Sequence, residues 1–270
     1  MSYWREKRAV ITGGSAGLGR VLAGALVERG ARVAIVGRDQ TRLDSASQEL
    51  SRGGGEGVLT IAADVTKQED VERLKVTLDE SWSGVDFFCH CAGRSMRGNV
   101  ITTPIDEFRE LWEINFLAAV RCTQAFGKAL AQNGGHVVLI GSLASKVAPR
   151  FLGAYPSSKF PLAAFAQQLR LELGPSGVHT LLVCPGPIAR EDAGNRYSEA
   201  DSAVPDQARK PGGGAKVKAI DPRRLSEEIL RACENRQAEL TVPCRARLLF
   251  ALAQLSPRLG DWLLRKTTSG

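Results

Sequence analysis

Short apolar runs alternate with helical patterns along most of this chain. The runs lie at residues 8–12, 32–36, 58–62, 86–90, 136–140, 178–183 and 239–242, with helices expected between most of them. Strands that are apolar on both faces must be covered on both faces, and helical crossovers make successive strands parallel. We therefore expect a three-layer, doubly wound α/β fold with a seven-stranded, mainly parallel sheet. Residues 1–244 would form this single domain.

Two segments depart from the alternation. Residues 187–218 are polar and contain glycine and proline, and a loop of this length in a compact domain is usually a lid or a binding loop. Residues 245–270 form a basic amphipathic extension, which Pro257 and Gly260 are expected to split into two short helices. Such helices can lie on a membrane surface, pack against their own domain, or contact a partner subunit.

The chain carries a formal net charge of +7, with basic residues gathered at 209–224 and 245–266. No nucleic-acid-binding motif accompanies them, so we expect no nucleic-acid partner. A solvated surface, an anionic ligand and an anionic membrane remain open as explanations. No run reaches the roughly 18 apolar residues that span a bilayer, and the N-terminus lacks an apolar signal core. We expect a cytoplasmic protein, with peripheral membrane contact through the extension as an open alternative.

The six cysteines are expected to be reduced thiols, and we expect no bound metal. Cys89-His90-Cys91 lies in a predicted strand, where residues two apart share a face and His90 points away from both thiols. The chain has three histidines, and none falls into a zinc-binding spacing with the cysteines.

A glycine-rich loop, Thr12-Gly13-Gly14-Ser15-Ala16-Gly17-Leu18-Gly19, follows the first strand. Its glycines allow a tight turn and close approach of the backbone to a phosphate, which the next helix attracts through its N-terminal amides. Ligands of open parallel sheets bind at the carboxyl ends of the strands. The loop therefore predicts a dinucleotide site that includes Gly13, Ser15, Gly17, Leu18 and Gly19.

The second strand ends in Gly37-Arg38-Asp39. A carboxylate at the strand tip would bind the ribose hydroxyls of NAD, whereas the arginine found here suits the 2′-phosphate of NADP. NADP(H) is the expected cofactor. Asp39 lies one or two positions too late, and it keeps NAD(H) as the runner-up.

Other strand ends supply supporting positions. After the third strand, the carboxylate of Asp64-Val65 can accept the adenine amino group. After the fourth, the small residues Ala92-Gly93 let a cofactor lie against the backbone. The sixth strand ends in Pro185-Gly186-Pro187-Ile188.

Tyr155 and Lys159 are the expected reactive pair. Residues four apart lie on one face of a helix. A free tyrosine has a pKa near 10, and a neighbouring ammonium favours the phenolate and lowers that pKa towards neutrality. Ser142, at the end of the fifth strand, can hold a substrate oxygen beside the phenol.

These motifs, in this order and spacing, resemble those of the short-chain dehydrogenase/reductase family. The likeness spans about residues 8–244. It implies a Rossmann fold and hydride transfer between a nicotinamide ring and a carbonyl or alcohol carbon. It also implies a homodimer or homotetramer.

Position by position, the resemblance makes 12–19 the cofactor loop, Asp64 the adenine contact, and Pro185-Gly186 the turn beside the nicotinamide. Asn115 would hold a water in the proton relay. Ser142, Tyr155 and Lys159 would form the catalytic triad, and Lys159 would also bind the nicotinamide ribose.

Three features depart from the family pattern. His90-Cys91 stands where two asparagines are usual, which removes a side-chain amide near the cofactor and the central helix. Arg190 replaces a threonine that commonly contacts the nicotinamide carboxamide. Pro156 is tolerated in a first helical turn, but Pro161 should cost a backbone hydrogen bond and bend its helix.

The sequence thus predicts an NADP(H)-dependent oxidoreductase with Tyr155 as general acid/base. Residues 94–99, 143–152 and 187–218 would select the substrate. Their apolar members favour a partly apolar carbonyl or alcohol. The resemblance implies a lipid-, steroid- or ketosphinganine-like compound, because relatives that act on such lipids often carry an apolar C-terminal extension. The alternative is an NAD(P)-binding regulatory or scaffold protein on the same fold, without turnover.

Overall fold

The computed structural model describes residues 2–52, 57–190, 204–209 and 218–267. The glycine-rich turn at 53–55 and most of the predicted 187–218 loop therefore lie outside the described residues.

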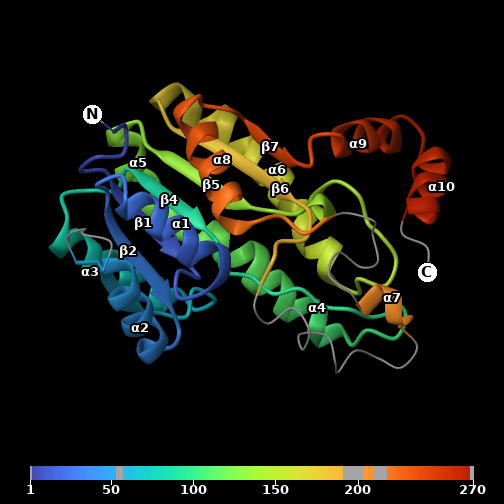
Figure 1. The fold of residues 1–270 in the computed structure, drawn as a ribbon, viewed down its shortest axis with the longest axis horizontal. Coiled ribbons are helices and arrows are strands. Elements are labelled where there is room, and N and C mark those ends of the chain that lie inside the picture. The colour runs from blue at the N-terminus through green and yellow to red at the C-terminus, as the bar shows by residue number, and fades with distance from the viewer. Residues whose placement is uncertain (1, 53–56, 191–203, 210–217, 268–270) are drawn as a thin grey trace.

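Within these ranges, the strands form a single sheet in the order β3-β2-β1-β4-β5-β6-β7, and every pairing is parallel (Figure 1). The strands are β1 (Arg8–Thr12), β2 (Arg32–Gly37), β3 (Leu59–Ala62), β4 (Phe87–His90), β5 (His136–Ile140), β6 (His179–Pro185) and β7 (Glu239–Val242). The chain order reverses between β1 and β4, and this switch point is where doubly wound sheets bind their ligands. The predicted fold class is confirmed.

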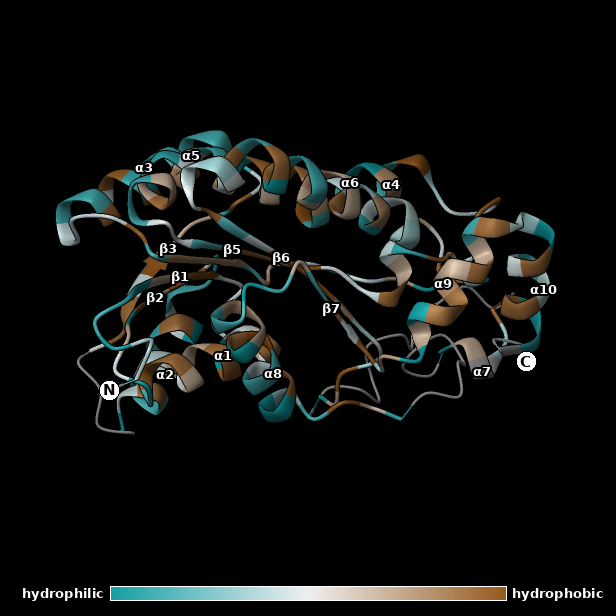
Figure 2. Ribbon diagram, turned by 90° about the horizontal axis from the view of Figure 1, so that it is seen from above, coloured by the Kyte–Doolittle hydropathy of each residue, from teal (hydrophilic) through white to brown (hydrophobic). Residues whose placement is uncertain are grey.

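Helices cover both faces of the sheet, as Figure 2 shows. One layer contains α1 (Gly17–Val27), α2 (Gln40–Ser51) and α8 (Pro222–Glu234), and the other contains α3 (Gln68–Ser81), α4 (Ile105–Trp112), α5 (Ala118–Asn133) and α6 (Tyr155–Leu173). The side chains of β1 alternate between two apolar cores, Val10 packing towards the α3–α5–α6 face and Ile11 towards the α1–α2–α8 face. This burial on both faces is what the unbroken apolar runs predict.

The long helical segment between β4 and β5 is not one continuous α-helix. A π-helical turn at Glu113–Leu117 separates α4 from α5. Asn115 lies within this turn and is fully buried. Such turns are rare and are frequent at functional sites.

α6 begins at Tyr155 with Pro156 in its first turn, as expected, and continues through Pro161 to Leu173. Because Pro161 has no N–H to donate to the preceding turn, the helix continues through this position with one backbone hydrogen bond fewer.

The C-terminal extension forms two helices, α9 (Ala246–Leu255) and α10 (Pro257–Thr267), which project from the body beyond β7 in Figure 1. The helical structure is interrupted at Ser256, just before Pro257. Gly260 is not at the break but inside α10, where a Cβ atom would lie 2.9 Å from Cα of Ala253. The glycine therefore allows the two helices to pack closely. No helix among the described residues is long and apolar enough to cross a bilayer.

Candidate active site

A cavity of about 750 Å³ opens at the carboxyl edge of the sheet, where β1 and β4 end. Most of the predicted site residues line it: Gly13, Ser15, Gly17, Leu18, Gly19, Ala92, Gly93, Asn115, Ser142, Tyr155, Lys159, Pro185, Gly186 and Ile188. Arg38, Asp64 and Val65 are not among the lining residues. They lie beyond it, at the ends of β2 and β3.

The glycine loop is shaped as a cradle. Gly13 has a φ of +67°, and a Cβ atom there would lie 2.9 Å from the backbone nitrogen of Ala92. A side chain at Gly19 would overlap the carbonyl of Gly13. The N-cap of α1 is Ala16, and no side chain caps this helix. Its first-turn amides thus face an anion site without a competing side-chain acceptor.

Arg190 reaches this loop. Its guanidinium carbon lies 3.7 Å from the position that a Cβ atom of Gly17 would occupy, and it lines the cavity. The sequence marked Arg190 only as the loss of a threonine contact. The geometry places a cation beside the anion cradle, where it can pair with a pyrophosphate.

The tip of β2 lies next to the same loop. A Cβ atom built on Gly37 would be 3.5 Å from the hydroxyl of Ser15, and Arg38 follows as an exposed side chain. The carboxylate of Asp39 accepts a hydrogen bond from the backbone of Arg42 at 3.1 Å and so caps α2. This capping role explains why the acidic residue lies beyond the strand tip.

Asp64 is engaged locally. Its carboxylate accepts hydrogen bonds from the backbone nitrogen and the hydroxyl of Thr66, at 3.1 and 2.7 Å. Val65 is buried beneath this turn.

His90 stands at a position where an asparagine is usual, and its imidazole makes two hydrogen bonds that link separate segments. Its Nδ1 lies 3.1 Å from the hydroxyl of Thr12, and its Nε2 lies 3.2 Å from the carbonyl of Ile114. A carbonyl only accepts, so Nε2 carries the proton and Nδ1 accepts from Thr12. Burial, reinforced by the charge of Lys159, lowers the pKa of His90 to about 3. A neutral imidazole thus ties the end of β1 to the π-helical turn.

The thiols beside it lie on the other side of the strand, as the alternation predicts. The sulfurs of Cys89 and Cys91 are 3.5 Å apart, and Cys91 lines the cavity.

Asn115 is held by three hydrogen bonds. Its Nδ2 donates to the carbonyl of Arg94 at 2.8 Å and to the hydroxyl of Ser158 at 2.9 Å, and its Oδ1 accepts from the backbone nitrogen of Arg94 at 3.0 Å. Both amide protons are therefore used to join the strand end after β4 to α6. The side chain therefore holds the chain after β4 and the helix α6 in place. A water bound by this residue cannot be held by Nδ2 and must be held by another atom of the residue.

Lys159 points into the cavity one turn after Tyr155. Its Nζ donates to the carbonyl of Ile140 at 2.9 Å, and burial lowers the pKa of its ammonium to about 8. A Cβ atom on Gly93 would lie 3.5 Å from this Nζ, so the cofactor strand end and the lysine are adjacent. Ser142 accepts from the backbone nitrogen of Ala144 at 3.1 Å, which leaves its hydroxyl proton available for a substrate oxygen.

The extension forms the opposite wall. Leu249 and Phe250 of α9, Leu264 and Lys266 of α10, and Arg245 line the same cavity as the tyrosine. Of the alternatives for the extension, packing against its own domain is thus realised in part.

Its other face is open. Leu248, Leu255, Leu259 and Trp262 are 67%, 81%, 38% and 50% exposed. The sequence did not predict that the extension contributes to the site, because its amphipathic pattern does not say what each face contacts.

Part of the predicted loop is anchored at the rim. The buried guanidinium of Arg97, which also lines the cavity, donates from Nε to the carbonyl of Ala208 at 2.8 Å. Ala208 belongs to α7 (Asp206–Arg209), a short helix of the 187–218 segment.

Known proteins share the sequence pattern and the architecture of this chain. The family model for short chain dehydrogenases matches residues 7–201. The chain is 30% identical over 240 residues to dehydrogenase/reductase SDR family member 7B of Danio rerio, an alignment that covers 86% of this chain and 76% of that protein.

Two solved structures share the fold. A short-chain dehydrogenase from Streptomyces avermitilis superposes with a TM-score of 0.80 at 24% identity, covering 100% of this chain and 98% of that one. A short-chain dehydrogenase from Sphingobium yanoikuyae in complex with NADPH gives 0.74 at 25% identity, covering 88% of each chain. With the sheet order, the glycine cradle and the Ser142, Tyr155 and Lys159 cavity, these matches show that the chain belongs to the short chain dehydrogenase family.

Proposed function

We propose that this protein is an NADP(H)-dependent oxidoreductase that reduces a carbonyl group, or reversibly oxidises the corresponding alcohol. The observation that carries the proposal is the buried Lys159. Its Nζ is fixed on the carbonyl of Ile140 beside Gly93, one helical turn from Tyr155 and in one cavity with the glycine loop.

The residues present fit a dinucleotide. A side chain at Gly13 would collide with the backbone of Ala92, and one at Gly19 would collide with the carbonyl of Gly13, so only glycines allow the tight turn of this loop. The uncapped start of α1 and Arg190 supply positive potential beside it, which suits a pyrophosphate. Ser15 lies beside Gly37 at the tip of β2, and the exposed Arg38 follows Gly37 in the chain. This pair of residue types suits a 2′-phosphate, while the carboxylate of Asp39 is occupied in capping α2. The NADPH complex of the Sphingobium yanoikuyae relative supports the same cofactor.

When bound, NADPH supplies the hydride. Tyr155 donates a proton to the carbonyl oxygen, and the hydroxyl of Ser142 holds that oxygen by a second hydrogen bond. The ammonium of Lys159 stabilises the phenolate left on Tyr155. Asn115 fixes Arg94 and α6 relative to each other, and so fixes the position from which Tyr155 acts.

The substrate end of the cavity favours an apolar molecule. Leu249, Phe250 and Leu264 from the extension line it together with Val147 and Leu152. A lipid- or steroid-like carbonyl compound fits this lining better than a sugar does, because buried hydroxyls would find few partners there.

The test is NADPH consumption over a panel of apolar carbonyl compounds, with Tyr155→Phe as the matched variant. Loss of the proton donor should lower kcat by about 10²- to 10⁴-fold. NADPH binding, followed by nicotinamide fluorescence, should be unchanged in the variant. Tight NADPH binding without turnover of any carbonyl would instead favour the regulatory or scaffold alternative.

The open face of the extension also supports peripheral membrane contact. Leu255 and Trp262 are exposed among Arg258, Arg265 and Lys266, the composition of a helix that lies on anionic lipid. Leu255→Glu with Trp262→Glu should abolish sedimentation with anionic vesicles and leave the cavity wall intact. Unchanged sedimentation would rule out this contact.

A homodimer or homotetramer, implied by the resemblance, is testable by sedimentation equilibrium.

A further inference from the structure

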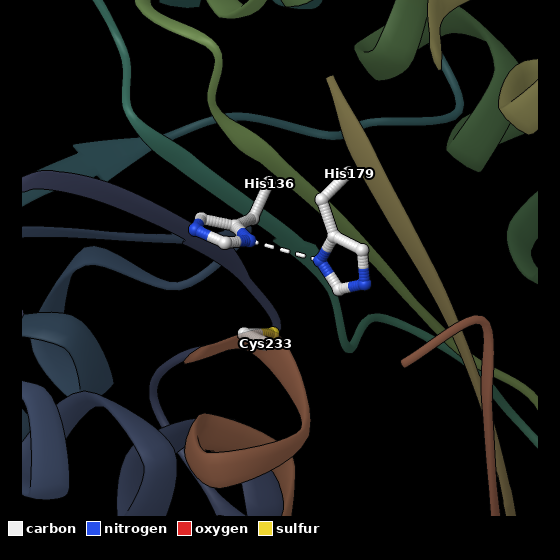
Figure 3. A group of neighbouring side chains, drawn as sticks. All are labelled: His136, His179 and Cys233. Atoms are coloured by element: carbon white, nitrogen blue, oxygen red, sulfur yellow. Dashed lines mark hydrogen bonds between the residues drawn. The ribbon is translucent and has the colours of Figure 1, made fainter. Parts of the chain in front are cut away.

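Three metal-binding side chains meet at the amino edge of the sheet, opposite the cavity. His136 and His179 are the first residues of β5 and β6 and pair with each other in register. Cys233 lies near the end of α8, which covers this edge. Figure 3 shows both imidazoles and the thiol converging on one point.

The donor atoms are close and shielded from solvent. Both ring nitrogens and the sulfur lie within 4.8 Å of one another, and the two Nδ1 atoms are 2.9 Å apart. The three residues are 2%, 5% and 0% exposed. In a tetrahedral zinc site, bond lengths of about 2.0–2.3 Å place neighbouring donors roughly 3.3–3.6 Å apart. The imidazoles would need to separate by only about half an ångström to admit the ion.

Both imidazoles have an outer partner of the kind that orients metal ligands. Nε2 of His179 lies 2.7 Å from the carbonyl of Gln237, which only accepts, so this nitrogen is protonated and Nδ1 carries a lone pair. Nε2 of His136 lies 2.7 Å from the hydroxyl of Tyr3, which can accept or donate. Without an ion, His136 donates from Nδ1 to His179. With an ion, its proton moves to Nε2 and donates to Tyr3.

The hydrogen-bonded pair accounts for the two histidines but not for the thiol. The thiol of Cys233 makes no hydrogen bond among the described residues, although its sulfur lies within 4.8 Å of a ring nitrogen of each histidine. Burial raises the pKa of this thiol well above its ordinary value. It is therefore protonated until an ion displaces the proton.

We propose that His136, His179 and Cys233 bind one zinc ion, which ties α8 and the N-terminal segment to the amino edge of the sheet. Two imidazole nitrogens and a thiolate select zinc over magnesium or calcium, which prefer oxygen ligands. Three protein ligands leave the fourth tetrahedral position to a water. The site lies at the far edge of the sheet from Tyr155, so its role is in stability and not in hydride transfer.

The charges around the cluster are mixed. Lys7 and Arg236 oppose a cation near His136, and Arg170 and Arg236 oppose it near His179. Asp86 favours a cation near His136, and Glu234 acts on Cys233 in the same favourable direction. The thiolate that forms on binding cancels one of the two charges of the ion. The field of these groups therefore does not exclude zinc.

The test uses the full-length protein, stripped with a chelator and titrated with Co²⁺ as a spectroscopic probe and then with Zn²⁺. We expect one ion per chain, a thiolate-to-cobalt charge-transfer band that Zn²⁺ bleaches, and release of one proton per ion, from Cys233. The melting temperature should rise with Zn²⁺.

Cys233→Ser should abolish the charge-transfer band, and His179→Gln should weaken binding at least tenfold. Cys122→Ser is the matched control, because Cys122 is equally buried but lies on the opposite face of the sheet, in α5, and it should keep the band. The proposal is overturned if the wild-type protein gives no charge-transfer band, or if the band persists in Cys233→Ser. The wild-type spectrum and proton count decide the matter even if a variant does not fold.

Discussion

Replacement of His90 by leucine should destabilise the protein at neutral pH far more than in acid. The imidazole is 1% exposed and bridges the hydroxyl of Thr12 and the carbonyl of Ile114. Leucine has a similar volume but no hydrogen-bonding group, so it leaves the carbonyl and the hydroxyl proton without this partner. Each such buried group costs about 1–3 kcal/mol, which gives a loss of roughly 2–5 kcal/mol at pH 7.

The acid side follows from the lowered pKa. Burial, with the charge of Lys159, brings the pKa of His90 from 6.5 to about 3 in the folded protein. Between these two values the unfolded chain binds the proton and the folded protein does not. The unfolding free energy of the wild type therefore falls as the pH drops below 6.5, by about 1.4 kcal/mol per pH unit. At pH 4.5 the wild type should have lost roughly 2–3 kcal/mol that the leucine variant, which has no group to titrate here, keeps.

Urea unfolding of both proteins at pH 7 and pH 4.5 measures this double difference. The gap in unfolding free energy between wild type and His90→Leu should shrink by roughly 2–3 kcal/mol at the lower pH. A gap of the same size at both pH values would refute a buried, neutral His90. His90→Asn separates the two effects, because it keeps hydrogen-bonding groups but does not titrate.

Three further predictions concern the cofactor and substrate sites. Arg38→Ala should weaken NADPH binding about 10- to 100-fold in a fluorescence titration, because a charge-assisted hydrogen bond is lost, and it should leave NADH binding unchanged. Equal losses for both cofactors would contradict the role of Arg38 at the 2′-phosphate. Phe250→Asp places a carboxylate in an apolar wall, so it should lower kcat/KM for apolar carbonyl compounds at least tenfold with little change in NADPH affinity. An unchanged kcat/KM would show that the extension is not part of the substrate site. Because burial lowers the pKa of Lys159 to about 8, its charge is lost above that pH, so the rate of carbonyl reduction should fall on the alkaline side of pH 8. In Lys159→Arg, whose guanidinium stays protonated, the pH–rate profile should be slower overall and should lack the step at about pH 8, so that any remaining alkaline fall reports deprotonation of the donor Tyr155.

The sheet and the catalytic positions were predictable because they depend on local patterns. A short unbroken apolar run, such as residues 9–11 in β1 or 33–36 in β2, predicts a strand buried on both faces, as both are. The spacing of Tyr155 and Lys159 places both on one helical face, and both line the cavity.

The π-helical turn at Asn115 was not predictable in this way. Neither proline nor glycine marks it, and the hydrogen bonds of Asn115 to Arg94 and Ser158 join segments that only the finished fold brings together. The role of His90 depends likewise on Thr12 and Ile114, far away in the sequence. The place of Arg190 beside Gly17 depends on where a long side chain packs. In each case the deciding contact is tertiary, and no periodicity of the sequence encodes it.

The proposed role of the extension would give a shared fold its own substrate range. The glycine cradle and the Ser142, Tyr155 and Lys159 positions belong to the family and specify a reaction, but not a substrate. In this chain α9 presents Phe250 to the cavity while Leu248 and Leu255 of the same helix are exposed. The helix has 10 residues and is therefore about 15 Å long. If the exposed face contacts a membrane as proposed, a lipid substrate would reach the cavity along this helix without crossing bulk water. Removal of the extension should therefore abolish activity on vesicle-bound substrate more completely than activity on a small carbonyl compound in solution.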